Sequence, residues 1–122
     1  MRGSLPHWIT SNELGCIIAV ADLDSNSVTV LPDVQAIDRL AHGRASATDL
    51  ELLESLGRLG SVRESAAALH MHHSSVAYRI GSISETLGFD IRSLDRRYRA
   101  RTALLLWQLH VSPRAKKTYS RI

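Results

Sequence analysis

Cysteine is nearly absent from this sequence of 122 residues, and Cys16, the single one, can form no disulfide within the chain. It lies in an apolar run and is expected to be buried and reduced, as in a cytoplasmic protein. Aromatic residues make up only 5%, so the core must be aliphatic. The longest apolar run, residues 15–21, falls well short of the roughly 18 residues of a membrane span and lies too far in for a secretory signal.

Acidic residues are scarce toward the end of the chain. Residues 92–122 carry nine basic side chains and one acidic side chain, a balance of +8. Residues 1–47 have three basic and five acidic side chains (−2), and residues 48–91 have three basic and six acidic (−3). A polyanion is therefore expected to be attracted chiefly to the C-terminal third, although such a basic stretch also fits a solvated end.

The first third of the chain gives only local signals. Residues 1–13 show no periodicity and are expected to be an irregular lead-in. The β-branched apolar run at residues 16–21 has a buried-strand signature, although a short helix also fits, and residues 28–31 suit a second strand in a hairpin. Pro32 opens a helix predicted to end near Ala41, and residues 43–47 are interpreted as a linker.

The next segment has stronger helix signals. Thr48 and Glu51 fit a capping box, in which the threonine hydroxyl accepts from a free amide and the glutamate reaches back. An apolar stripe of leucines at 50, 53, 56 and 59 follows, closed by Gly57 and Gly60. Ser61 begins a second capping box, which predicts a short helix of about two turns.

A break at residues 70–72 separates that short helix from a third helix, predicted over residues 73–87. Gly88 suits a left-handed cap, and Phe89 can supply the accompanying hydrophobic contact. A last helix is expected over residues 95–110. The remaining residues, 111–122, are a basic tail.

A long helix, a two-turn helix, a short break and a longer helix together are the helix-turn-helix arrangement. Ala66 must be small because the two motif helices cross there. The expected core includes Leu53, Leu56, Ala66, Leu69, Val76, Ile80 and Leu104. The outer side of the third helix then carries His72, His73, Ser74, Ser75, Ala77, Tyr78 and Gly81. In this motif that side enters the major groove, and its first residues reach base edges.

Residues 61–80 resemble the C-terminal helix-turn-helix of PucR-type (CdaR-like) bacterial transcription regulators. In that family an Ala-x-x-Leu-His-x-His segment opens the recognition helix, and here it runs from Ala66 to His72. Further segments match in order at 87–91 and 97–104, and weaker ones upstream at 21–23 and 31–41. The resemblance covers about residues 48–110, and it implies that the chain is the C-terminal piece of a longer regulator.

The resemblance implies a mainly α fold, with a helix-turn-helix domain of about four helices at 48–110 behind a short strand-plus-helix segment at 1–47. It also implies a sequence-specific regulator, not an enzyme, that binds double-stranded DNA as a homodimer without cofactor, metal or membrane. The expected DNA-binding residues are Arg63, His72, His73, Ser74, Ser75, Ala77, Tyr78, Arg79, Arg97 and Arg99. The alternative function is a protein-interaction or dimerisation module that keeps the helix-turn-helix shape, which the −3 balance of residues 48–91 favours.

Several of these residues have a simpler interpretation. Histidines at 70, 72 and 73 invite a metal site, but their spacing fits no helical i, i+4 pair and no acidic ligand lies close by in sequence. Tyr78 equally suits half-buried packing, the arginines at 96, 97, 99 and 101 a solvated helix face, and Ser74 and Ser75 a helix cap. Gly81 costs its helix about 1 kcal/mol relative to alanine, which close approach of another helix or of DNA would explain.

Overall fold

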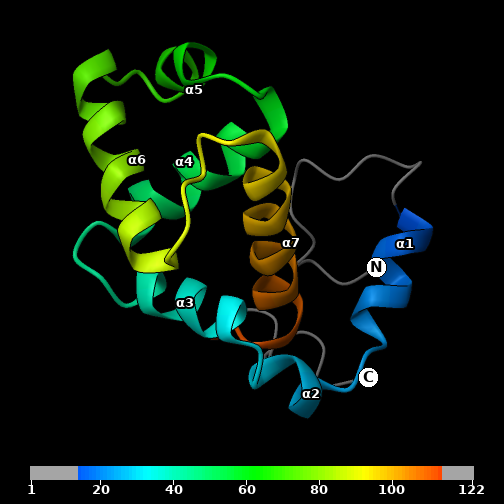
Figure 1. The fold of residues 1–122 in the computed structure, drawn as a ribbon. Helices are drawn as coiled ribbons and strands as arrows, with labels where there is room; N and C mark the ends of the chain where they lie inside the picture. Colours follow the sequence, from blue (N-terminus) through cyan, green and yellow to red (C-terminus); the bar gives the residue numbers. More distant parts are fainter. Residues whose placement is uncertain (1–13, 114–122) are drawn as a thin grey trace. The chain divides into compact units, whose positions relative to one another are not determined.

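The computed structural model describes residues 14–113, and in this part of the chain it contains seven helices and no strand (Figure 1). The helices are α1 Leu14–Ala21, α2 Ser25–Thr29, α3 Pro32–Ala41, α4 Ser46–Leu59, α5 Val62–Ala68, α6 His73–Leu87 and α7 Leu94–His110. The mainly α fold predicted from the sequence is confirmed. The expected lead-in at 1–13, most of the basic tail and the side chain of Cys16 lie outside what the structure describes.

The strand predicted for residues 16–21 and its hairpin with residues 28–31 are wrong. The first run is part of α1, and Val28 lies buried in α2. An apolar run of six residues is too short for its periodicity to distinguish a strand from a helix. Its β-branched residues favoured a strand, and the segment is a helix. At the second segment Asp24 favours a helix, because its carboxylate accepts a hydrogen bond from the Asn26 amide and caps α2.

The chain divides into two compact units. The described residues of the first are 14–38 and 103–113, and those of the second are 39–102. In the first unit the Trp107 indole nitrogen donates to Asp38 at 3.0 Å, and the His110 ring bridges the Ser25 hydroxyl and the Val20 carbonyl at 2.9 and 2.8 Å. These bonds tie the C-terminal part of α7 to α2 and α3.

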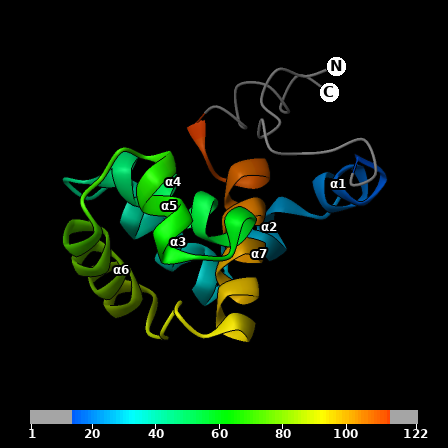
Figure 2. The same ribbon diagram turned by 90° about the horizontal axis from the view of Figure 1, so that it is seen from above.

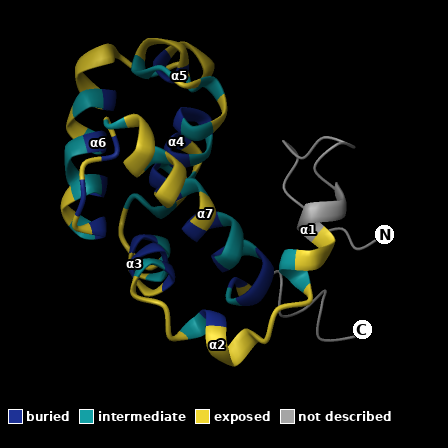
Figure 3. Cartoon of the chain, turned by 45° about the vertical axis from the view of Figure 1, so that its right-hand side comes forward, coloured by how far each residue is buried: buried dark blue, intermediate teal, exposed yellow. Residues whose placement is uncertain are grey.

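The second unit has an aliphatic core, as the composition required. Helices α4, α5 and α6 contact one another pairwise and lie together in both views (Figures 1 and 2). Buried residues, dark blue in Figure 3, recur along α4 and α6. Of the predicted core, Leu53, Leu56, Ala66, Val76 and Ile80 are buried there, Leu104 is buried in the first unit, and Leu69 is only half-buried.

The ends of the helices test the capping signals one by one. Ser61 caps α5 as predicted, since its Oγ accepts from the Glu64 amide at 2.9 Å. Gly88 ends α6 in the left-handed conformation, with φ of 84°. The capping box at Thr48 is wrong, because α4 begins at Ser46 and Ala45 occupies its N-cap without a side-chain bond. Thr48 therefore lies inside the first turn of α4.

Replacing Ala66 by leucine is expected to cost the second unit about 1–3 kcal/mol in unfolding free energy. Ala66 is only 7% exposed on α5, which contacts both α4 and α6, so three extra carbon atoms must displace packed neighbours. Thermal denaturation followed by circular dichroism measures the change. Ala67→Leu is the matched control, because Ala67 is exposed on the same helix. Equal stability of the two variants would contradict this packing.

Candidate nucleic-acid interface

A turn of four residues, 69–72, joins α5 to α6 and sets the direction of α6. His70 adopts a left-handed conformation with φ of 54°, which is uncommon for a residue other than glycine. The Met71 amide donates to the Ala66 carbonyl at 2.9 Å, and the His70 amide donates to the Ala67 carbonyl at 3.2 Å. This pair of bonds is the Schellman motif that closes a helix. His70 thus has the turn role that the sequence suggested.

His72 begins α6 as its N-cap. The ring Nδ1 accepts from the Ser74 amide at 3.2 Å and lies 2.8 Å from the Ser74 hydroxyl. Because Nδ1 accepts an N–H, it carries no proton itself, and the hydroxyl donates to it. The predicted contact residues His72 and Ser74 are therefore hydrogen-bonded to each other in the structure.

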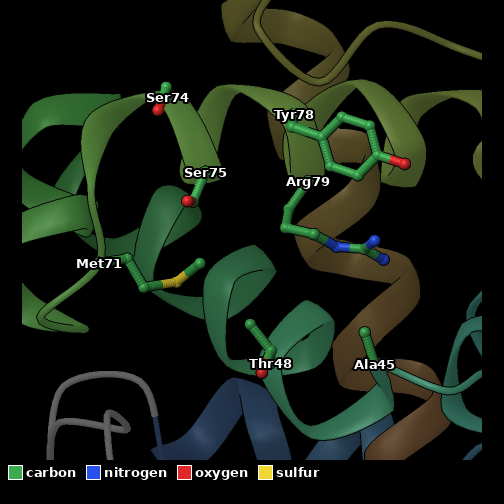
Figure 4. A pocket seen from close by; sticks show the side chains of 7 residues that line it. All are labelled: Ala45, Thr48, Met71, Ser74, Ser75, Tyr78 and Arg79. Atoms are coloured by element: carbon green, nitrogen blue, oxygen red, sulfur yellow. The ribbon is translucent and has the colours of Figure 1, made fainter.

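The first two turns of α6 present polar side chains outward. His73, Ser74 and Ser75 are exposed, and Tyr78 is 71% exposed, which excludes the packing alternative for the tyrosine within the described chain. Beside them lies an open hollow of about 440 Å³ (Figure 4). Its lining comes from α6, from the turn before it and from the start of α4: Ala45, Thr48, Met71, Ser74, Ser75, Tyr78 and Arg79.

Arg79 fixes α6 against α4. Its Nε and Nη2 donate to the two carboxylate oxygens of Asp49 at 2.9 and 2.7 Å, a bidentate pair. The Asp49 side chain is 6% exposed and that of Arg79 is 24% exposed. The hydrogen bonds to Asp49 raise the pKa of Arg79 above its ordinary value, against the opposing effect of burial. A raised pKa means that the protonated Arg79 guanidinium contributes stability below its unfolded-state pKa, and that this contribution is lost only as the pH rises through the raised pKa, in the strongly alkaline range.

Of the other predicted site residues, two arginines are exposed, Ala77 is half-buried, and one arginine is hydrogen-bonded within the fold. Arg63 is exposed in the first turn of α5, and Ala77 is half-buried on α6. Arg99 is exposed on α7, with its guanidinium 4.2 Å from the centroid of the Phe89 ring. Arg97 is bound within the fold, because its Nη1, Nη2 and Nε donate to the carbonyls of residues 60, 92 and 91 at 2.6, 3.0 and 3.3 Å.

The structure therefore brings His72, His73, Ser74, Ser75 and Tyr78 together on one exposed surface, at the N-terminal half of α6. Two of the predicted cations, Arg79 and Arg97, already have partners inside the second unit. Sequence reasoning missed Asp49, whose pairing with Arg79 spans thirty positions in the chain. It also missed Arg92, which folds back onto α6, and no local pattern marks either residue.

Two further findings concern other kinds of site. Among residues 14–113 no group of three or more histidine, cysteine, aspartate or glutamate side chains is arranged to hold a metal ion. None of the helices in that range has the length and apolar character needed to cross a membrane.

A short helix, a left-handed turn and a longer helix with an exposed N-terminal half define a helix-turn-helix protein. Residues 50–106 match the family model described as the PucR C-terminal helix-turn-helix domain, and this segment of the chain is a PucR-type helix-turn-helix domain. No curated protein and no solved structure shows a significant match to the chain. The domain type is that of a DNA-binding regulator, as the sequence resemblance implied.

Proposed function

We propose that the chain is the DNA-reading part of a transcription regulator and that α6 is its recognition helix in the major groove. The observation that carries the proposal is the exposed polar surface on the first two turns of α6, with His73, Ser74 and Tyr78 directed away from the core. In helix-turn-helix proteins these turns reach base edges. The Asp49–Arg79 pair supports the proposal because its two hydrogen bonds fix the orientation of α6 against α4.

The contacts divide into base reading and phosphate attraction. His73, Ser74, Ser75 and Tyr78 set the sequence preference, since their side chains are short or planar hydrogen-bonding groups at the tip of α6. Arg63 and Arg99 attract phosphates, because both arginines are exposed. Arg79 and Arg97 act chiefly as positioning residues, since Asp49 accepts two hydrogen bonds from Arg79 and three carbonyls accept from Arg97.

The wider setting follows from the same proposal. One recognition helix reads only a few base pairs, so the regulator binds DNA as a homodimer on two half-sites. The chain then corresponds to the C-terminal end of a longer bacterial, cytoplasmic regulator.

The second candidate function, a protein-interaction module, is favoured by the −3 charge balance of residues 48–91. A salt-dependent gel shift separates the two, because counterion release makes DNA binding weaken steeply with salt.

Ser74→Ala is expected to weaken binding to a preferred duplex by about 1–3 kcal/mol and to change binding to random DNA little. The preferred duplex comes from selection of bound sites in a random pool. Ser82→Ala is the matched control, because Ser82 lies on the same helix two turns further on and beyond the reading turns. Titrations of both variants on both duplexes give the comparison. Equal weakening of both duplexes by Ser74→Ala would remove α6 as the reading element.

A further inference from the structure

Arg92 follows α6 in the chain, yet its side chain turns back onto that helix. Its Nη2 donates to the Ala77 carbonyl at 3.4 Å. A Cβ added at Gly81 would lie 4.0 Å from the same nitrogen, with no closer neighbour among the described residues outside its own helix backbone. The Arg92 side chain nevertheless stays 50% exposed. Helix α6 thus carries a cation on its surface that its own sequence does not contain.

This cation lies on the side of α6 that faces away from α4. Positions 77 and 81 are each two residues from Arg79, which is about 200° around an α-helix. Arg79 points to α4 through its bonds to Asp49. The two arginines therefore mark opposite flanks of α6, and Tyr78 lies on the outward face between them.

The small residues at 77 and 81 explain how Arg92 fits. A glycine in a helix costs stability, and the packing of the second unit does not require one at position 81. Because position 77 carries only a methyl group and position 81 carries no side chain, the guanidinium of Arg92 lies against the helix. The flank of α6 stays narrow and still carries a positive charge.

A helix in the major groove has a sugar–phosphate strand on each side. The groove is roughly 12 Å wide, and an α-helix with its side chains measures roughly 10–12 Å. We propose that Arg92 binds phosphates of the strand on the flank away from α4, so that a loop residue completes the DNA contact of α6. The inference rests on the proposed function of α6.

Asp90 is the residue with which DNA must compete. Its Oδ1 accepts from the Arg92 amide at 3.0 Å and lies 3.5 Å from Nη1 of the guanidinium. Both side chains are at least half exposed, so the ion pair between them is weak and screened by salt. A phosphate oxygen can take the place of Asp90 at the guanidinium while the bond to the Arg92 amide keeps the loop in shape.

Arg92→Gln tests the inference by titration of the full chain on the selected duplex and on random DNA at several salt concentrations. Loss of one phosphate contact is expected to weaken both complexes alike and to reduce the slope of log affinity against log salt by about 1. Arg58→Gln is the matched control, because it removes the same charge from an exposed position in the last turn of α4. Its slope is expected to stay close to that of the wild type.

Gly81→Gln is a second variant that separates binding from folding. Glutamine favours a helix more than glycine, and a Cβ meets only the tip of Arg92, so the Tm is expected to hold or rise. Binding to both duplexes is expected to fall roughly tenfold, because the side chain fills the space that Arg92 and the strand share.

Unchanged salt slope and affinity in Arg92→Gln, with a wild type that binds the selected duplex, would overturn the role of Arg92 and leave α6 as the reading helix. Normal DNA binding by Gly81→Gln would overturn it as well. A wild type that binds no duplex would instead overturn the proposed function, and with it the role of Arg92.

Discussion

Replacing Arg79 by methionine is expected to lower the unfolding free energy by about 3 kcal/mol, which corresponds to a fall in Tm of roughly 10 °C. The substitution keeps most of the side-chain volume but leaves the carboxylate of Asp49, which is 6% exposed, without its two charged hydrogen bonds. A buried charge without a partner is among the most costly defects in a folded protein. Thermal and urea denaturation followed by circular dichroism give the change.

Two further variants show whether the pair itself is responsible. The double variant Asp49→Leu with Arg79→Met removes both charges and is expected to recover most of the stability, because two apolar side chains of similar size replace a buried ion pair at little cost. Arg79→Lys keeps the charge and loses the two-pronged geometry, so an intermediate stability is expected. A double variant no more stable than Arg79→Met alone would show that the cost lies in packing and not in the unpaired carboxylate.

His73→Glu is expected to reduce DNA affinity about a hundredfold while the fold stays intact. His73 is the exposed first residue of α6, whose first turn holds no acidic side chain. A carboxylate there interacts favourably with the helix dipole, so the stability is expected to hold or to rise by about 0.3–1 kcal/mol. If α6 binds in the major groove as proposed, the same charge faces phosphates and base edges, where like charges cost several kcal/mol.

The readouts for His73→Glu are thermal denaturation and duplex titration on the same preparation. Thr102→Glu is the matched control, since it adds one negative charge at an exposed position of α7. Only a modest loss of affinity is expected for it, from the change in net charge. Equal losses in the two variants would mean that the tip of α6 is not in the groove and that charge alone governs binding.

Local signals predicted much of the fold. Pro32 and the apolar spacing after it gave the bounds of α3, and Gly88 gave the end of α6, because each acts on its own stretch of backbone. Ser61 capped α5 as expected, whereas Thr48 did not cap α4. The same capping pattern therefore succeeded once and failed once, since a helix that gains from packing can extend past a good cap.

The candidate site was predictable only in part. The outward residues of α6 follow from helical periodicity once Val76 and Ile80 are taken as core, and both are buried. The partners of the arginines do not follow, because Arg79 meets Asp49 across thirty positions and Arg97 meets the Gly60 carbonyl across 37. Such contacts depend on how helices come together in space, which a single sequence does not encode in any local pattern.

The cap on α6 also determines which hydrogen-bonding groups remain at its tip. With Nδ1 of His72 accepting from the Ser74 amide, the ring proton is on Nε2, which is left as a donor. The Ser74 hydroxyl donates its proton to Nδ1, so that only the lone pairs of its oxygen remain, and these accept hydrogen bonds. The two groups differ in the base atoms that they can meet, because an N–H donates to acceptors such as N7 of a purine, whereas a hydroxyl oxygen accepts from donors such as the N6 amino group of adenine. Within the proposed function, the imidazole tautomer of a capping residue thus determines which groups at the tip of α6 donate hydrogen bonds to bases and which accept them.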